Sequence, residues 1–353
     1  MNGGAGRPAS AAHAAATTNA HTNHRIREPG IISLILHSNL PPFDPLVRNP
    51  HLQTILGHYW KRPDVTAQFP VERRLFRTEP DVHVLVLSQR PRGQARGEIV
   101  MVHGLEGSGD AGYMRSLSAA ALRAGYAAHR FHMRTCGGTH SLCNTLYHAG
   151  LTSDLREVLR QLRAEGRAPA CLVGFSLGGN VVLKLAGELG DSAPELVRGV
   201  IAVSTPLDLA ACARRIGEPD NRIYETRFVR RMRDRLYTSG RYRREEFRGL
   251  RTVVELDDRF TAPSFGFGNA ANYYRLQSCI GFLARIRIPG LMIQAKDDTF
   301  IPFDLFNSAP VRNHPTVQLT VMEHGGHLGF LGRRPHRFWA DDAIMEWIMA
   351  RQC

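Results

Sequence analysis

Cys171-Leu172-Val173-Gly174-Phe175-Ser176-Leu177-Gly178-Gly179-Asn180 is the stretch that decides the fold of this chain. A short apolar run leads into Gly-x-Ser-x-Gly, and a helix-like segment at 181–189 follows at once, which predicts a strand, a sharp turn and a helix. Side chains at Gly174 and Gly178 would collide with neighbouring backbone in such a turn, and glycine removes the clash. We predict that Ser176 is a nucleophile held at the end of the strand; the alternative is a glycine-rich turn with a surface serine.

Apolar runs that predict strands alternate with amphipathic runs that predict helices on both sides of this stretch. Two alternating segments come first and predict an antiparallel strand pair at 69–77 and 82–87. The alternation predicts an α/β fold with a mostly parallel, doubly wound sheet that helices cover on both faces. The other predicted strands are 98–104, 126–132, 171–175, 199–203, 290–295 and 317–322, and the predicted helices are 111–124, 150–165, 177–189, 303–308 and 337–350.

The alternation stops between about 206 and 287, where an Arg-, Tyr- and Phe-rich region has helical character. Because open α/β sheets bind ligands at the carboxyl ends of their strands, we expect this insertion to form a helical cap there. Residues 1–27 are mostly Ala, Gly, Thr, Asn and His in no periodic order, which predicts a disordered tail. We therefore expect one α/β domain at 28–353, in which 41–55 is an irregular lead-in.

The composition is that of an ordinary soluble globular protein. The 353 residues are 43% hydrophobic and 22% charged, which suits one large domain. No apolar run is long enough to span a bilayer, and residues 1–27 lack the apolar stretch of a secretory signal. Six cysteines occur without a CxxC pair, which indicates reduced thiols rather than a disulfide framework. We expect a cytoplasmic protein with no transmembrane segment.

The formal net charge of +13 raises the question of a nucleic-acid partner. Nearly all the cations are arginine, and no recognised nucleic-acid-binding motif accompanies them, so we consider nucleic acid an improbable partner. The densest cluster runs from Arg227 to Arg251. It suits peripheral contact with anionic lipid or a phosphate-bearing substrate, while the default interpretation is a solvated helical face.

An acid and a base for Ser176 follow in the order that serine hydrolases on such sheets use, which is Ser, then Asp or Glu, then His. Asp298 stands after the strand predicted at 290–295, in an Asp-x-apolar-apolar-Pro turn, and is the expected acid. Asp297 is the second candidate, and both aspartates could instead cap the short helix that follows.

The expected base is His327, in a glycine-rich loop after the last predicted strand. Two glycines precede His327 and would let the loop fold its imidazole back toward Ser176. His324 lies nearer to the strand and is the rival candidate.

The negative oxygen of a tetrahedral intermediate needs two hydrogen-bond donors that already point at it. We expect the backbone N–H of Leu177 to be one of them and the backbone N–H of Leu105 to be the other. Leu105 lies in His-Gly-Leu-Glu-Gly after the strand predicted at 98–104; the alternative is a turn that merely ends this strand. No Walker loop, HExxH pair or zinc-ligand spacing is found, so we expect neither a cofactor nor a metal.

With these residues in place, the chain resembles the α/β-hydrolase superfamily and, within it, the YheT-like branch of esterases and lipid hydrolases. The resemblance covers roughly residues 40–350. The strings that carry it are Asn49-Pro50-His51-Leu52-Gln53-Thr54, His103-Gly104-Leu105-Glu106-Gly107-Ser108, Gly174-Phe175-Ser176-Leu177-Gly178-Gly179-Asn180, Phe265-Gly266-Phe267, Asn272-Tyr273-Tyr274, Ala295-Lys296-Asp297-Asp298 and Gly325-Gly326-His327-Leu328-Gly329-Phe330.

The resemblance implies a triad of Ser176, Asp298 and His327, ester substrates that are often lipid-like, and no cofactor. The chain departs from the branch at Thr135, in Arg-Thr-Cys-Gly-Gly, where relatives typically carry glycine. That change puts the shape of one loop in doubt and leaves the triad untouched.

Three functions follow from these patterns. The first is a serine esterase that cleaves carboxylic esters of a small-molecule acyl substrate through an acyl-enzyme. The second is a thioesterase or phospholipase, because the same triad attacks any acyl group. The third, from a different class, is a catalytically idle binding module that contacts anionic surfaces through its arginine-rich cap.

Overall fold

The computed structural model of the chain describes Met1 and residues 40–352. Apart from Met1, the tail predicted at 1–27 lies outside the described residues, and so does the predicted domain start at residue 28. Residues 40–352 belong to one compact unit. The elements described below belong to this unit.

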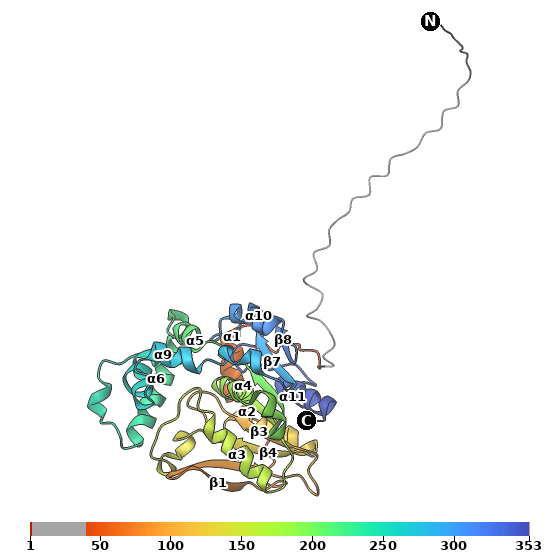
Figure 1. Cartoon of the computed structure of the whole chain (residues 1–353), viewed down its shortest axis with the longest axis horizontal. Coiled ribbons are helices and arrows are strands. Elements are labelled where there is room, and N and C mark those ends of the chain that lie inside the picture. The colour runs from red at the N-terminus through yellow and green to blue at the C-terminus, as the bar shows by residue number, and fades with distance from the viewer. Residues whose placement is uncertain (2–39, 353) are drawn as a thin grey trace. The chain divides into compact units, whose positions relative to one another are not determined.

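The centre of the unit is an eight-stranded sheet (Figure 1) with the order β1-β2-β4-β3-β5-β6-β7-β8. β1 and β2 pair antiparallel and β2 pairs antiparallel with β4, whereas all pairs from β4 to β8 are parallel. The mostly parallel α/β sheet predicted from the sequence is thus confirmed. The strands are β1 (Glu72–Glu79), β2 (Val82–Gln89), β3 (Glu98–Val102), β4 (Ala127–Phe131), β5 (Ala170–Phe175), β6 (Val197–Val203), β7 (Gly290–Ala295) and β8 (Val317–Met322).

Helices follow the strands and cover both faces of the sheet. Between β6 and β7 the chain leaves the sheet for a series of helices, the larger of which lie together to one side of it in Figure 1. The helices outside this insertion are α1 (Pro50–Tyr59), α2 (Gly112–Arg123), α3 (Ser153–Ala164), α4 (Leu177–Leu189), α10 (Ala309–Arg312) and α11 (Trp339–Arg351). Those inside it are α5 (Leu209–Ile216), α6 (Arg222–Thr238), α7 (Val253–Leu256), α8 (Ala262–Ser264) and α9 (Ala270–Gln277).

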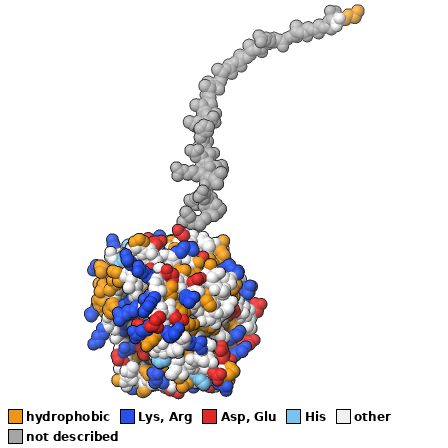
Figure 2. All heavy atoms as spheres, turned by 90° about the vertical axis from the view of Figure 1, so that its left-hand side faces the viewer, with side chains coloured by type: hydrophobic (Ala, Val, Ile, Leu, Met, Phe, Trp, Pro, Cys, Tyr) orange, Lys and Arg blue, Asp and Glu red, His pale blue; other side chains and the backbone are white. Residues whose placement is uncertain are grey.

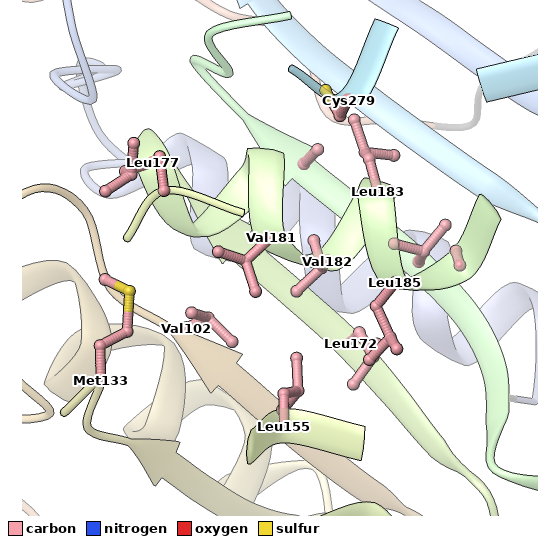
Figure 3. Close-up of a cluster of buried hydrophobic side chains, with 14 of the residues drawn as sticks. Val102, Met133, Leu155, Leu172, Leu177, Val181, Val182, Leu183, Leu185 and Cys279 are labelled. Atoms are coloured by element: carbon pink, nitrogen blue, oxygen red, sulfur yellow. The ribbon is translucent and has the colours of Figure 1, made fainter. Parts of the chain in front are cut away.

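The central strands are buried on both faces, which explains their continuous apolar sequences. In β3, Val100 and Val102 join the hydrophobic cluster on one face, whereas Ile99 and Met101 join the cluster on the other. Figure 3 shows the first cluster, where Val181, Val182 and Leu185 of α4 lie near strand side chains. Successive side chains of a strand point to opposite faces, so each strand contributes to both clusters.

The lead-in predicted to be irregular contains a regular helix, α1, so that prediction was wrong. Asn49 is its N-cap and accepts a hydrogen bond from the Leu52 N–H at 3.0 Å. Pro50 occupies the first helical position, where a missing N–H costs nothing. The Asn-Pro pair is a helix-start signal that the sequence carried.

Candidate active site

Ser176 lies between the end of β5 and the first residue of α4, with φ 52° and ψ −121°. A positive φ is uncommon for a residue with a side chain and occurs where the surroundings enforce it. A Cβ atom added at Gly174 would lie 2.3 Å from the carbonyl oxygen of Gly178, and one added at Gly178 would lie 2.2 Å from that of Val102. The turn therefore requires glycine on both sides of Ser176.

The structure brings Ser176, His327 and Asp298 together. The Nε2 atom of His327 is 2.9 Å from Ser176 Oγ, and its Nδ1 atom is 3.0 and 3.1 Å from the two carboxylate oxygens of Asp298. An ionised carboxylate only accepts hydrogen bonds, so the Nδ1 atom carries the proton. The lone pair of Nε2 then faces the hydroxyl of Ser176, which is the arrangement that a general base needs.

Asp298 is fixed by its own turn. Its side chain has no exposed surface, and Oδ1 also accepts the N–H groups of Phe300 at 2.9 Å and Ile301 at 3.1 Å. The amide of Gln294 donates to Oδ2 at 3.2 Å. Because every donor holds the carboxylate in place, Asp298 can orient the imidazole of His327.

The two rival candidates, Asp297 and His324, bond to each other. The Nδ1 atom of His324 is 3.2 Å from Asp297 Oδ2, and the N–H of Gly326 donates to Asp297 Oδ1 at 2.9 Å. Asp297 therefore supports the loop that carries His327, while His324 is 36% exposed in its side chain.

Leu105 and Leu177 line the same cavity as Ser176. Leu177 is the first residue of α4, and first-turn amides have no acceptor within their own helix. Gly104 brings the loop after β3 against Ser176, since a Cβ atom added there would lie 3.1 Å from Ser176 Cβ. The loop after β3 therefore packs against the turn that carries Ser176.

His103 fixes the backbone of this loop rather than taking part in proton transfer. Its Nδ1 atom donates to the Gly104 carbonyl at 2.8 Å, and its Nε2 atom accepts the N–H of Met133 at 3.2 Å. Burial lowers the pKa of His103 to about 3, although the bond to Gly104 opposes the shift. The ring is therefore neutral at physiological pH.

Glu106 and Arg235 form a buried ion pair that the sequence analysis missed. Arg235 Nε donates to Glu106 Oε1 at 2.8 Å, and the Tyr147 hydroxyl donates to the same oxygen at 3.2 Å. Both charged side chains are less than a tenth exposed. Arg235 belongs to α6, so this pair ties the loop of Leu105 to the insertion. A glutamate within a glycine-rich loop was the only sequence signal for it.

Thr135 adopts the left-handed backbone conformation, with φ 63°. Glycine adopts this conformation at no steric cost, whereas a threonine there is strained. The Thr135 hydroxyl donates to the carbonyl of Arg134 and accepts a long bond of 3.4 Å from Arg235. The Thr135 side chain therefore adds a contact to the pair of Glu106 and Arg235.

Helix α1 holds the loop that carries His327. The side-chain amide of Gln53 donates to the Leu331 carbonyl at 3.0 Å, and its oxygen accepts the Leu331 N–H at 3.0 Å. The Thr54 hydroxyl accepts the N–H of His327 at 2.9 Å. Gln53 and Thr54, which are adjacent on α1, thus provide two backbone anchors for the histidine loop.

The cavity beside Ser176 is mainly apolar and is walled by the insertion as well as by the sheet domain. Asp257 stands out in it because burial raises the pKa of its carboxyl group to about 6, against the hydrogen bonds from Tyr274 and Thr261. Asp257–Thr261 is a turn of π-helix, a form often found at functional sites. The other lining residues are Leu105, Tyr147, His148, Ala149, Leu177, Pro206, Leu209, Cys212, Ala213, Ile216, Phe228, Met232, Arg235, Val253, Tyr273, Tyr274, Phe300 and Ile301.

The described part of the chain holds neither a metal-ligand cluster nor a membrane-spanning helix. Among residues 40–352, no three His, Cys, Asp or Glu side chains are grouped in a way that could hold a metal ion. Within the same residues, each helix is too short or too polar to cross a bilayer.

The chain is similar in sequence to known members of one hydrolase family and to named esterases and lipases. Residues 99–341 match the model of a family described as the alpha/beta hydrolase family. YheT of Escherichia coli (strain K12), whose name classes it provisionally as an esterase, is 32% identical over 85% of this chain and 90% of its own length. The monoacylglycerol lipase of Saccharomyces cerevisiae is 26% identical over 72% of this chain and 59% of its own length.

A solved structure of an esterase from Pyrococcus furiosus superposes with a TM-score of 0.55. The match covers 82% of this chain and 96% of that one at 16% sequence identity. At that identity the two proteins share a fold, and nothing further follows from the superposition.

Proposed function

The chain belongs to the α/β-hydrolase family, and on that basis we propose that it is a serine esterase with Ser176 as nucleophile, His327 as base and Asp298 as the orienting acid. The observation that carries the proposal is the pair of hydrogen bonds at His327, 2.9 Å to Ser176 and 3.0 Å to Asp298. The names of the Escherichia coli and yeast relatives support ester hydrolysis as the reaction.

The proposed reaction has two halves. His327 takes the proton of Ser176 as the hydroxyl oxygen attacks the ester carbonyl, and the N–H groups of Leu105 and Leu177 stabilise the oxyanion. His327 then gives its proton to the alcohol, which leaves an acyl group on Ser176. A water molecule then loses a proton to His327 as its oxygen attacks the acyl carbon, and His327 returns that proton to the Ser176 oxygen as the carboxylic acid leaves.

Because the cavity is apolar, we propose that the acyl chain is the part of the substrate that it buries. Residues 206–287 supply much of its wall, so we propose that this insertion is the cap that selects the chain. The same nucleophile attacks thioesters and phospholipids, and the preference among these substrates depends on the shape of the cavity.

An acyl-chain series tests the proposal. p-Nitrophenyl esters from acetyl to palmitoyl, and matched thioesters, are offered to the wild type, to Ser176→Ala and to the exposed-serine control Ser141→Ala. We expect hydrolysis and labelling by a fluorophosphonate probe in the wild type and the control, and neither in Ser176→Ala. Labelling that persists in Ser176→Ala would overturn the assignment.

We also propose the cytoplasm as the compartment. Cys136, Cys212 and Cys279 are buried free thiols, which suits a reducing environment.

A further inference from the structure

An apolar strip is exposed where α1 meets α6. Leu52, Ile55 and Tyr59 lie on one face of α1, at helical spacing, and are 49%, 42% and 69% exposed. Ile223, at the start of α6, is 82% exposed. Single exposed apolar residues are common, but a strip of four across two helices marks an interaction surface.

Side-chain contacts place the two helices next to each other. The rings of His51 and Tyr224 stack with centroids 5.7 Å apart, and their side chains share a hydrogen bond of 3.2 Å. Further along, Arg227 donates to the Tyr59 hydroxyl at 2.8 Å. Ile223 lies one helical turn before Arg227 and directly before Tyr224, so it extends the strip of α1.

Cations surround this strip. Arg222, Arg230 and Arg231 are exposed on α6, Arg48 precedes α1, and Lys61 follows it. Figure 2, which views the side of the molecule where α6 lies, shows Lys and Arg side chains interspersed with hydrophobic ones. The acidic side chains of α6 do little to offset them, because Glu225 is buried and Asp234 is 4.0 Å from Arg230 in an exposed pair.

The electrostatic environment of His58 agrees with this distribution of charge. Burial lowers the pKa of its imidazole, and the nearby Arg227, Arg231 and Arg62 lower it further. The last turn of α1 therefore lies in a positive potential.

We propose that the α1–α6 face, defined as Leu52, Ile55, Tyr59, Ile223 and the cations around them, binds the surface of an anionic lipid bilayer. Apolar side chains backed by arginines are the arrangement of helices that lie in a membrane interface. The apolar residues enter the boundary between headgroups and acyl chains, and the cations contact lipid phosphates. A nucleic acid would satisfy the cations and leave the apolar strip in water.

Side-chain contacts connect the α1–α6 face to the candidate active site. Tyr224 packs on Phe300 with centroids 4.8 Å apart, and Phe300 packs on His327 at 4.5 Å. The opposite side of α6 contributes Phe228 and Met232 to the cavity beside Ser176. Docking would therefore hold an apolar cavity against a source of acyl chains; this consequence rests on the proposed function, whereas the binding does not.

Vesicle co-sedimentation tests the binding. Phosphatidylcholine vesicles with and without phosphatidylglycerol are mixed with the wild type, Leu52→Ser/Ile223→Ser and Arg230→Gln/Arg231→Gln. Arg92→Gln/Arg123→Gln and Leu75→Ser are the matched controls, since those side chains are exposed elsewhere. We expect salt-sensitive binding that needs phosphatidylglycerol, and a loss of about 25-fold in the arginine variant, at about fivefold per cation.

Three outcomes would overturn the proposal. They are equal binding to both kinds of vesicle, equal losses in the control and test variants, and no vesicle binding by the wild type, as expected if the face binds another protein. Hydrolysis of p-nitrophenyl acetate is measured in parallel and should be unchanged in the test variants. A wild type that binds vesicles as described but hydrolyses no ester would refute the proposed function and leave this inference standing.

Discussion

At the scale of single residues, the geometry around Ser176 depends on neighbours that have no side chain. The backbone of Gly174 lies so close to that of Gly178 that a methyl group would have to displace main chain rather than a flexible side chain. The backbone conformation of Ser176 is therefore set by close packing between β5 and α4, and not by the preference of serine.

Gly174→Ala should lower the free energy of unfolding by about 2–3 kcal/mol, since overpacking a rigid site costs this much. Urea unfolding followed by circular dichroism measures it. Gly281→Ala is the control, because nothing lies within 4 Å of a Cβ atom there and its φ is ordinary. Equal stability of the two variants would show that the turn can relax.

The two neighbouring aspartates should differ sharply in their effect on ester hydrolysis. Asp298→Asn removes the carboxylate that fixes the imidazole of His327, and kcat should fall by about 10³ to 10⁴, as in other triads. Asp297→Asn weakens only the support of Gly326 and His324 and should cost less than about tenfold. Steady-state kinetics on one p-nitrophenyl ester decide, and a reversed ranking would move the acid role to Asp297.

At the scale of elements, two contacts join parts of the chain that are far apart in sequence. One joins α1 to the loop after β8, through Gln53. The other joins α6 to the loop after β3, through Arg235. Both end at loops that hold candidate catalytic groups, so each helix is a support for the site as well as a part of the fold.

Gln53→Leu should destabilise the protein by about 1–3 kcal/mol, because the buried N–H of Leu331 would lose its partner and the Leu331 carbonyl would keep only the bond from the Leu46 N–H. We also expect a lower kcat, since the histidine loop loses an anchor. Thermal unfolding and ester kinetics measure the two effects. The exposed Gln68→Leu provides the comparison, and a loss of equal size there would assign the effect to the substitution itself.

Arg235→Met should lower stability by about 3–5 kcal/mol, because Glu106 would remain as a buried charge without its partner. The double variant Glu106→Gln/Arg235→Met should recover part of that loss. A double-mutant cycle in urea measures the coupling energy. Additive losses would mean that the two side chains act independently.

At the scale of the whole molecule, the sequence predicts the sheet better than it predicts the insertion. The apolar runs of β5 and β7 have few alternatives to a buried strand, and β8 alternates apolar and polar residues as a half-buried strand does, so the predicted bounds of β7 and β8 agree with the structure to the residue. In α6, arginines occupy the solvent face, and Arg235 occupies the buried face. The residue types therefore do not indicate which face of this helix is buried. The site pairs Gln53–Leu331 and Glu106–Arg235 depend on three-dimensional proximity, and a single sequence carries no record of it.

The packing of α11 on α2 gives the molecule a pH-dependent stability. Burial raises the pKa of Asp341 to about 6, although Arg62 and the bond from Ser116 oppose the shift. A raised pKa means that the contribution of Asp341 to stability is full below about pH 4 and is lost as the pH rises through about 6.

Relative to Asp341→Asn, the wild type should therefore lose about 2–3 kcal/mol of stability between pH 4 and pH 7, at about 1.4 kcal/mol for each pKa unit. Chemical denaturation of both proteins across that range measures the difference. A constant difference would place the ionisation of Asp341 outside this range.

Gln53 and Leu331, which hydrogen-bond to each other, are 278 positions apart in the sequence. This separation determines when each partner becomes available during protein synthesis. While the chain emerges from the ribosome, α1 is made early and must wait for nearly all of the sheet before its partner loop exists. Contacts of such long range form late, because the intervening chain must first be ordered. Ser176 is thus synthesised long before His327, so under the proposed function a nascent chain carries no activated serine until its last strand and loop are in place.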